Sequence, residues 1–261
     1  MTPVLLLGFL FFPQDEKFLQ EPPEIHVEAK ADVWFASFHG SGRLNKWFGR
    51  EVDREKDAPR LSFDREGQLG ETEPAPGLDL RVVWEGEKHQ YQGVRVRYRH
   101  AAWSDSGTID RTFVVDGTTV PAGSSFHSRL QKDYGTVQFM GGIHLFDGLL
   151  DVGGWAGCHF HQESFKMATA PGEMKDAAGG LNATLGIQVE VHPLPFLFAA
   201  AELCYTGGFG VPESEAMISG GVLWGQLRLE AGYRHLWEWW DLDPSIRLSI
   251  GGAFVGASVR F

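Results

Sequence analysis

Three arginines at alternate positions, Arg95, Arg97 and Arg99, form a compact cluster of like charge. In an extended strand, alternate side chains project from the same face, so the three guanidinium groups would form a ladder. Guanidinium groups bind carboxylates and other anions through paired hydrogen bonds. The ladder therefore indicates either a network of buried ion pairs, which we favour, or a charged constriction or ligand site for a small anionic solute.

His159 and His161 are also spaced to share one face of a strand, and a His-x-His pair of this kind can bind a metal ion. A third ligand could come from Asp151, Glu190 or His144, but the spacing selects none of these residues. We therefore predict no metal and no other cofactor, and we retain His159 and His161 only as candidate metal ligands.

His127 and Ser128 have the residue types of a hydrolytic dyad, but neighbours in a strand project from opposite faces. The two side chains cannot form one dyad on their own. The sequence also has no phosphate-binding loop and no HExxH or GxSxG motif. We name no catalytic residue and favour a protein without enzymatic activity.

Alternation of apolar and polar residues recurs from residue 25 to the carboxyl end, and it is the pattern of strands with two unlike faces. No segment has helical periodicity or the spacing of a βαβ unit, which excludes the α/β folds. The pattern predicts an all-β, closed, antiparallel up-and-down barrel of about ten strands, within a range of eight to twelve. The predicted strands are residues 26–38, 78–84, 91–103, 124–145, 149–162, 181–191, 197–205, 216–224, 227–237 and 247–261.

The connections between these strands alternate between short turns and longer, more polar segments. We predict a single barrel domain over residues 25–261 with long loops near residues 40–77, 104–123 and 163–179. Bacterial membrane barrels show this asymmetry, with short turns on the periplasmic side and longer loops outside.

The last strand ends on Phe261, and Ala253, Val255, Ala257 and Val259 share its face. This signature resembles the closing strand of bacterial outer-membrane β-barrels, although it indicates no subfamily. The resemblance implies a transmembrane barrel in the outer membrane of a Gram-negative bacterium, exported and inserted by the barrel-assembly machinery, with outer-membrane lipids as partners.

Two further features belong to this hypothesis. Leu248 and Ile250 fall on the opposite parity from the later apolar residues, which predicts a β-bulge at Gly251 and Gly252. Aromatic residues near strand ends are predicted to form the interfacial girdles of a membrane protein. These aromatic residues are Trp34, Trp84, Trp103, Tyr205, Trp224, Tyr233, Trp237, Trp239 and Trp240.

In a membrane barrel the apolar faces point outward to lipid, so the charged faces must line the lumen. Buried charges have to be paired, and both signs are present in similar numbers. We therefore predict a salt-bridged lumen. Its predicted members are Glu28, Lys30, Asp32, Asp79, Arg81, Arg95, Arg97, Arg99, Glu190, Glu202, Arg228, Glu230 and Arg234.

Bulk properties agree with this interpretation. The chain has 261 residues and a formal net charge of −11, which argues against nucleic acid as a partner. Cys158 and Cys204 are predicted to be two buried thiols rather than one disulfide. Residues 1–20 are predicted to be a signal peptide, the alternative being an apolar tail that packs on the barrel.

The sequence thus predicts a structural or narrow pore-type outer-membrane barrel without evident catalysis. Two alternatives remain open. One is an outer-membrane enzyme that acts on lipid or peptide at the barrel rim, and the other is a soluble ligand-binding barrel.

Overall fold

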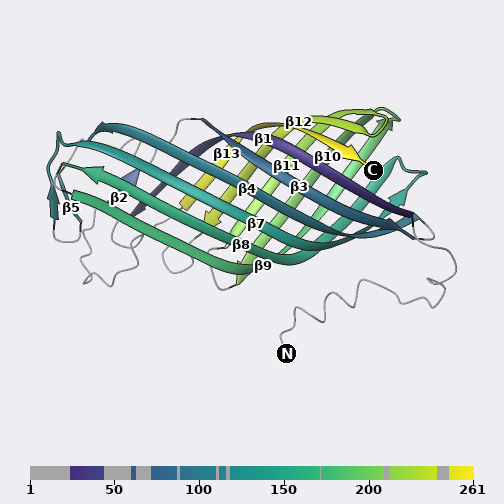
Figure 1. The fold of residues 1–261 in the computed structure, drawn as a ribbon, viewed down its shortest axis with the longest axis horizontal. Coiled ribbons are helices and arrows are strands. Elements are labelled where there is room, and N and C mark those ends of the chain that lie inside the picture. Colours follow the sequence, from purple (N-terminus) through teal and green to yellow (C-terminus); the bar gives the residue numbers. More distant parts are fainter. Residues whose placement is uncertain are drawn as a thin grey trace.

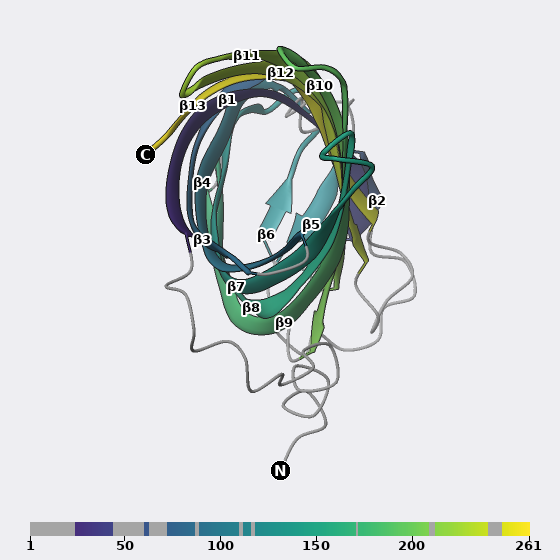
Figure 2. The same cartoon turned by 90° about the vertical axis from the view of Figure 1, so that its right-hand side faces the viewer.

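Ten antiparallel strands close into a barrel in the computed structural model (Figures 1 and 2). Pairing of the last strand with the first closes the sheet, so the predicted ten-stranded barrel is confirmed. The structure describes residues 24–43, 60–62, 72–86, 89–109, 112–115, 118–170, 172–208, 212–239 and 247–261. The predicted signal peptide therefore lies outside the described residues.

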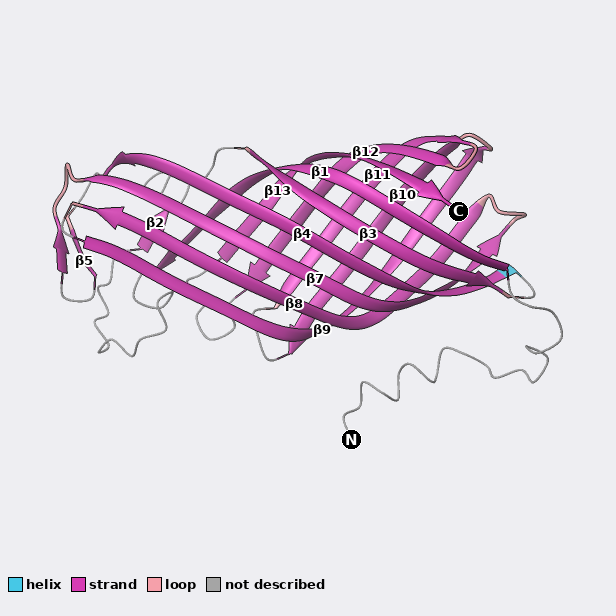
Figure 3. Ribbon diagram, in the orientation of Figure 1, coloured by secondary structure: helices cyan, strands magenta, loops and turns pink. Residues whose placement is uncertain are grey.

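The barrel strands follow one another around the wall in chain order. They are β1 (Glu24–Arg43), β3 (Glu73–Glu85), β4 (Gln90–Thr108), β7 (Ser125–Leu145), β8 (Leu150–Thr169), β9 (Gly172–Leu194), β10 (Leu197–Gly208), β11 (Glu213–Trp224), β12 (Leu227–Trp239) and β13 (Arg247–Arg260). The short strand β2 (Arg60–Ser62) pairs with the end of β1, and β5 (Phe113–Val115) and β6 (Thr118–Val120) form a separate hairpin. Figure 3 shows how completely strands make up the described chain. Among the described residues, no helix is long and apolar enough to cross a membrane.

The short turns and the carboxyl end of the chain lie together at one end of the barrel, on the right in Figure 1. At the other end, β4, β7, β8 and β9 extend beyond their neighbours. The predicted loop at 163–179 is largely wrong, because β8 and β9 stay paired as far as Thr169 and Gly172. Residues 104–108 likewise belong to β4. Ladder hydrogen bonds are made by the backbone, so polar side chains do not end a strand.

The apolar face of each strand points outward. On β9, Leu181, Leu185 and Ile187 are 59%, 58% and 57% exposed, while the intervening Asn182 and Thr184 are buried. This outward apolar run covers residues 181–191, which at the rise and tilt of a membrane strand spans about 25 Å, the height of a bilayer-facing band. A soluble barrel would bury this set instead, so the structure has the architecture of a transmembrane barrel.

The expected aromatic girdle is correct for some positions and wrong for two. Trp224 and Tyr205 are outward and exposed, as predicted. Trp34 and Trp103, however, lie inside the barrel at 0% and 1% exposure, and their indole nitrogens donate hydrogen bonds to wall carbonyls. Both belong to the buried apolar cluster of the interior, and the guanidinium groups of Arg99 and Arg234 lie over the Trp34 ring. Trp240 lies outside the described residues.

The bulge predicted at Gly251 and Gly252 is absent from the described part of β13. β13 pairs with β12 without interruption, and its pairing with β1 has the same register on both sides of a gap at Gly252 and Ala253. Ile250, at 1% exposure, simply faces the lumen, where it belongs to the same buried cluster as Trp34 and Leu236. The break in the sequence pattern reflects a change of the interior from charged to apolar.

The two cysteines face opposite sides of the wall and are both free. Cys158 is exposed on the outward face of β8, so the prediction of a buried thiol is wrong there, whereas Cys204 faces the lumen and contacts Thr184.

We expect a thiol-specific spin label to react with Cys158 in the folded protein at least about tenfold faster than with Cys204. Single-cysteine variants and electron paramagnetic resonance would measure this. Equal labelling of both thiols would contradict the facing described above.

Candidate functional site

The inward side chains sort into layers along the barrel axis, and the middle layer is an ion-pair network. Its centre is Arg95 on β4, which is 1% exposed. Arg95 Nη2 and Nε donate to Asp79 Oδ2 on the adjacent β3 at 2.5 and 2.8 Å. Arg95 Nη1 reaches Glu202 Oε2 on β10, across the lumen, at 3.2 Å. Arg97 also contacts both carboxylates. The network thus joins opposite walls.

The structure places every residue of the predicted lumen set on the inward face and in an ion pair. It adds one member, Glu215 on β11, which pairs with Arg234 at 2.5 Å. The cations are Lys30, Arg81, Arg95, Arg97, Arg99, Arg228 and Arg234, and the carboxylates are Glu28, Asp32, Asp79, Glu190, Glu202, Glu215 and Glu230. With Glu215 included, the two signs balance, which is the condition for burying so many charges in a narrow lumen.

A second cluster lies closer to the long-loop end and was missed by the sequence analysis. Lys132 on β7 is 2.8 Å from Glu213 Oε1 on β11 and 2.9 Å from Glu163 Oε1 on β8, and it also contacts Glu238 on β12. The sequence pattern places residues 163 and 213 in loops, and Lys132 is an isolated charge in its predicted strand. Its even spacing from the inward Tyr134 was the signal that could have revealed it.

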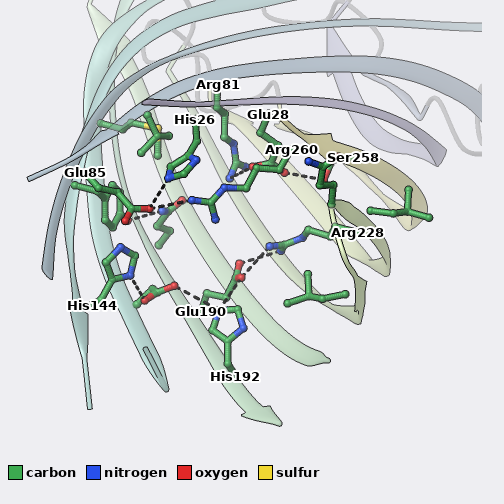
Figure 4. A pocket seen from close by; sticks show the side chains of 18 of the residues that line it. His26, Glu28, Arg81, Glu85, His144, Glu190, His192, Arg228, Ser258 and Arg260 are labelled. Carbon is green, nitrogen blue, oxygen red and sulfur yellow. Dashed lines mark hydrogen bonds and ion pairs between the residues drawn. The ribbon is translucent and has the colours of Figure 1, made fainter. Parts of the chain in front are cut away.

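A recess of about 370 Å³ occupies the short-turn end of the lumen (Figure 4). His144 Nδ1 lies 2.5 Å from Asp151, and His192 Nε2 lies 3.1 Å from Glu190 Oε1. Arg228 makes a bidentate pair with Glu190 at 2.8 and 2.9 Å. These ionisable groups of the recess are therefore paired with one another, although the space between them is open to a solute.

Beyond the recess, the described side chains fill most of the lumen. Two cavities among the ion pairs measure about 10 and 20 Å³, and each can hold roughly one water molecule. Toward the long-loop end the interior is a buried apolar cluster. Its larger members are Trp34, Trp103, Phe126, Leu130, Phe165, Leu236 and Ile250. The described residues thus close the barrel twice, first with charges and then with apolar side chains.

The structure also places the candidate metal ligands. His159 and His161 both point into the lumen, but Asp151, Glu190 and His144 belong to the recess at the other end of the strands. The carboxylate that meets the two imidazoles is instead Glu213, and the ligand atoms of the three residues lie within 4.8 Å of one another.

His127 and Ser128 do not form a dyad. Ser128 is buried on the lumen side at 1% exposure, while His127 is exposed on the outer face. His127 Nδ1 instead lies 2.8 Å from the hydroxyl oxygen of Ser106 on β4. This cross-strand pair sits above the apolar band, on the exposed outer surface of the four extended strands.

No protein-family model and no curated protein sequence matches this chain. Solved structures that resemble it include the outer membrane protease OmpT from Escherichia coli, at 9% identity and a TM-score of 0.41, over 95% of this chain and all of that one. The outer membrane protein OprG from Pseudomonas aeruginosa covers 92% of this chain and 97% of its own, at 7% identity and a TM-score of 0.34. Ail from Yersinia pestis, solved with the heparin analogue sucrose octasulfate, covers 90% and 99% at 12% identity and a TM-score of 0.36.

Proposed function

We propose that this protein is a structural barrel of the bacterial outer membrane with a sealed lumen. The observation that carries the proposal is Arg95, which is 1% exposed while it pairs with Asp79 and, across the lumen, with Glu202. A conducting pore needs a continuous aqueous path, whereas these side chains occupy the middle of the barrel. Closed barrels with an outward apolar band are the β-structures that span outer membranes, which supports the location.

The proposed orientation places the short turns and the recess in the periplasm and the four extended strands outside. Above the apolar band, Arg129, Lys166 and Lys175 stand directly opposite one another on β7, β8 and β9. Like charges in adjacent register repel, and among the described residues only Glu173 pairs with Lys166 and Lys175. Phosphate groups of outer-leaflet lipids would relieve that repulsion. This row therefore supports contact between the extended strands and anionic lipid headgroups.

We expect no steady single-channel current when the folded protein is reconstituted in a planar bilayer. Among the described residues, the two cavities between the ion pairs measure about 10 and 20 Å³, which is too small for a hydrated ion to pass. Heat-modifiable gel migration of the same preparation would verify that the barrel is folded. Stepwise currents that scale with voltage would contradict the proposal and favour a narrow pore.

A second candidate function, a hydrolase at the outer rim, is favoured by the Ser106–His127 pair alone. The hydroxyl is within hydrogen-bonding distance of an imidazole, as nucleophilic catalysis requires. Among the described residues, however, no carboxylate is bonded to the other imidazole nitrogen of His127 to orient it. We expect a fluorophosphonate probe to leave Ser106 unlabelled. Labelling that disappears in both Ser106→Ala and His127→Gln would establish the hydrolase instead.

A further inference from the structure

We propose that His159, His161 and Glu213 form a binding site for a divalent transition-metal ion of the zinc class inside the lumen. The two histidines come from β8, and Glu213 reaches them from β11. Their ligand atoms lie within 4.8 Å of one another. The site lies between the ion-pair network and the apolar cluster, apart from the recess.

The separation of the ligand atoms fits a shared ion better than it fits a hydrogen bond. His159 Nε2 lies 3.6 Å from Glu213 Oε2, which is too long for a hydrogen bond. Zinc binds imidazole nitrogen and carboxylate oxygen at about 2.0–2.2 Å, so two ligands of a tetrahedral ion are about 3.4 Å apart. Small side-chain shifts would bring both atoms into the coordination shell.

Both imidazoles carry a buried nitrogen that lacks a hydrogen-bond partner among the described residues. These atoms are His159 Nε2 and His161 Nδ1, on side chains with 4% and 7% exposure. An unsatisfied buried polar atom costs about 1–3 kcal/mol, so two such atoms in one layer indicate a ligand that accepts nitrogen lone pairs. Tyr134 Oη and Thr136 Oγ1 nearby also have no hydrogen-bond partner in the described part of the chain, and the Tyr134 ring stacks on His159.

The net charge of the cluster around Lys132 also favours a bound cation. Lys132 faces the three carboxylates of Glu163, Glu213 and Glu238, which leaves two formal negative charges when the histidines are neutral. The arginines of the lumen are paired with the carboxylates of the middle network and do not compensate this excess. A divalent ion would balance the layer, and a buried excess charge is otherwise expensive.

The donor set selects the kind of metal. Two imidazole nitrogens and one carboxylate suit zinc, cobalt, nickel or copper, whereas calcium and magnesium prefer oxygen ligands throughout. Lys132 lies 2.8 Å from Glu213 Oε1 and so holds the carboxylate with Oε2 turned toward His159. Such outer contacts orient metal ligands in known sites. Three protein ligands leave a fourth position for water.

The test is titration of the chelator-treated, folded barrel with Co²⁺, followed by its visible absorption and by equilibrium dialysis. We expect one equivalent to bind with the intense bands of a four-coordinate ion. His159→Gln and His161→Gln should each weaken binding at least about 100-fold, and Glu213→Gln at least about tenfold. His127→Gln, which alters an exposed histidine on the outer face, is the matched control and should bind as the unmodified protein does.

Heat-modifiable migration would show that each variant is folded. If a variant does not fold, X-ray absorption of the zinc-loaded unmodified protein decides, because the proposal requires two imidazole scatterers at about 2.0 Å. Oxygen-only coordination, or binding unchanged in both lumen variants, would overturn the proposal. Failure to bind metal either during folding or after it would do the same.

Discussion

Lys132→Met is expected to destabilise the folded barrel by about 3–5 kcal/mol or to prevent its folding, the largest effect of any substitution proposed for this protein. The methionine fills much of the same space, so packing changes little. The loss of the ammonium group leaves Glu163, Glu213 and Glu238 facing one another in a buried layer. Uncompensated carboxylates in a low-dielectric interior repel strongly and lose their hydration.

Equilibrium unfolding in urea, performed in detergent micelles with a chelator present, would measure the change in the free energy of unfolding. Lys166→Met is the matched control, because this lysine is exposed on the outer face of β8 and, within the described part of the chain, pairs only with Glu173. Exposed pairs contribute little, so the control should change stability by less than about 1 kcal/mol. A Lys132→Met variant as stable as the control would show that the cluster is not a buried charge network.

The faces of the strands could be predicted from the sequence because the period of a strand leaves only two directions for a side chain. The alternation in residues 181–191 therefore indicated both the lipid-facing set and the lumen-facing set. The same reasoning placed Arg95 and Asp79 inside, although only the fold could show that Glu202, more than one hundred residues away, meets Arg95 across the lumen. Register and strand order around the wall determine such contacts.

Elsewhere local alternation was misleading because the lumen is not uniform along its axis. Trp34 and Ile250 look like lipid-facing residues when every interior position is assumed to be polar. Near the long-loop end the interior is itself apolar. The alternation therefore still tells which residues share a face, but the polarity of a face no longer tells whether it points inward or outward. Glu213 and Glu163 were missed for a related reason. Their strands continue past the membrane band, where polar composition resembles that of a loop.

The two closures of the lumen have different physical consequences. The ion-pair network resists opening because each charge that leaves its partners would stay buried, whereas the apolar cluster resists wetting. The recess at the short-turn end lies outside both closures and keeps about 370 Å³ of open space. A solute from the proposed periplasmic side can therefore enter the recess without crossing the barrel, so binding there does not require conduction.

Leu185→Arg is expected to destabilise the barrel in a bilayer by about 2–4 kcal/mol, because Leu185 lies near the middle of the outward apolar run of β9 and is 58% exposed. A guanidinium group at that depth must face hydrocarbon or drag water into it. Gln162→Arg, on the outward face of β8 just beyond the exposed Phe160, is the control and should cost less than about 1 kcal/mol.

Reversible unfolding of both variants in lipid vesicles would measure the difference between the two positions. The comparison tests the membrane band directly, because the same side chain is introduced on the same outward face at two depths. In a soluble barrel both arginines would face water and have equal, small effects. Equal losses of unfolding free energy in Leu185→Arg and Gln162→Arg would therefore show that this face does not contact a bilayer. A clear difference would locate the hydrocarbon boundary between the two residues.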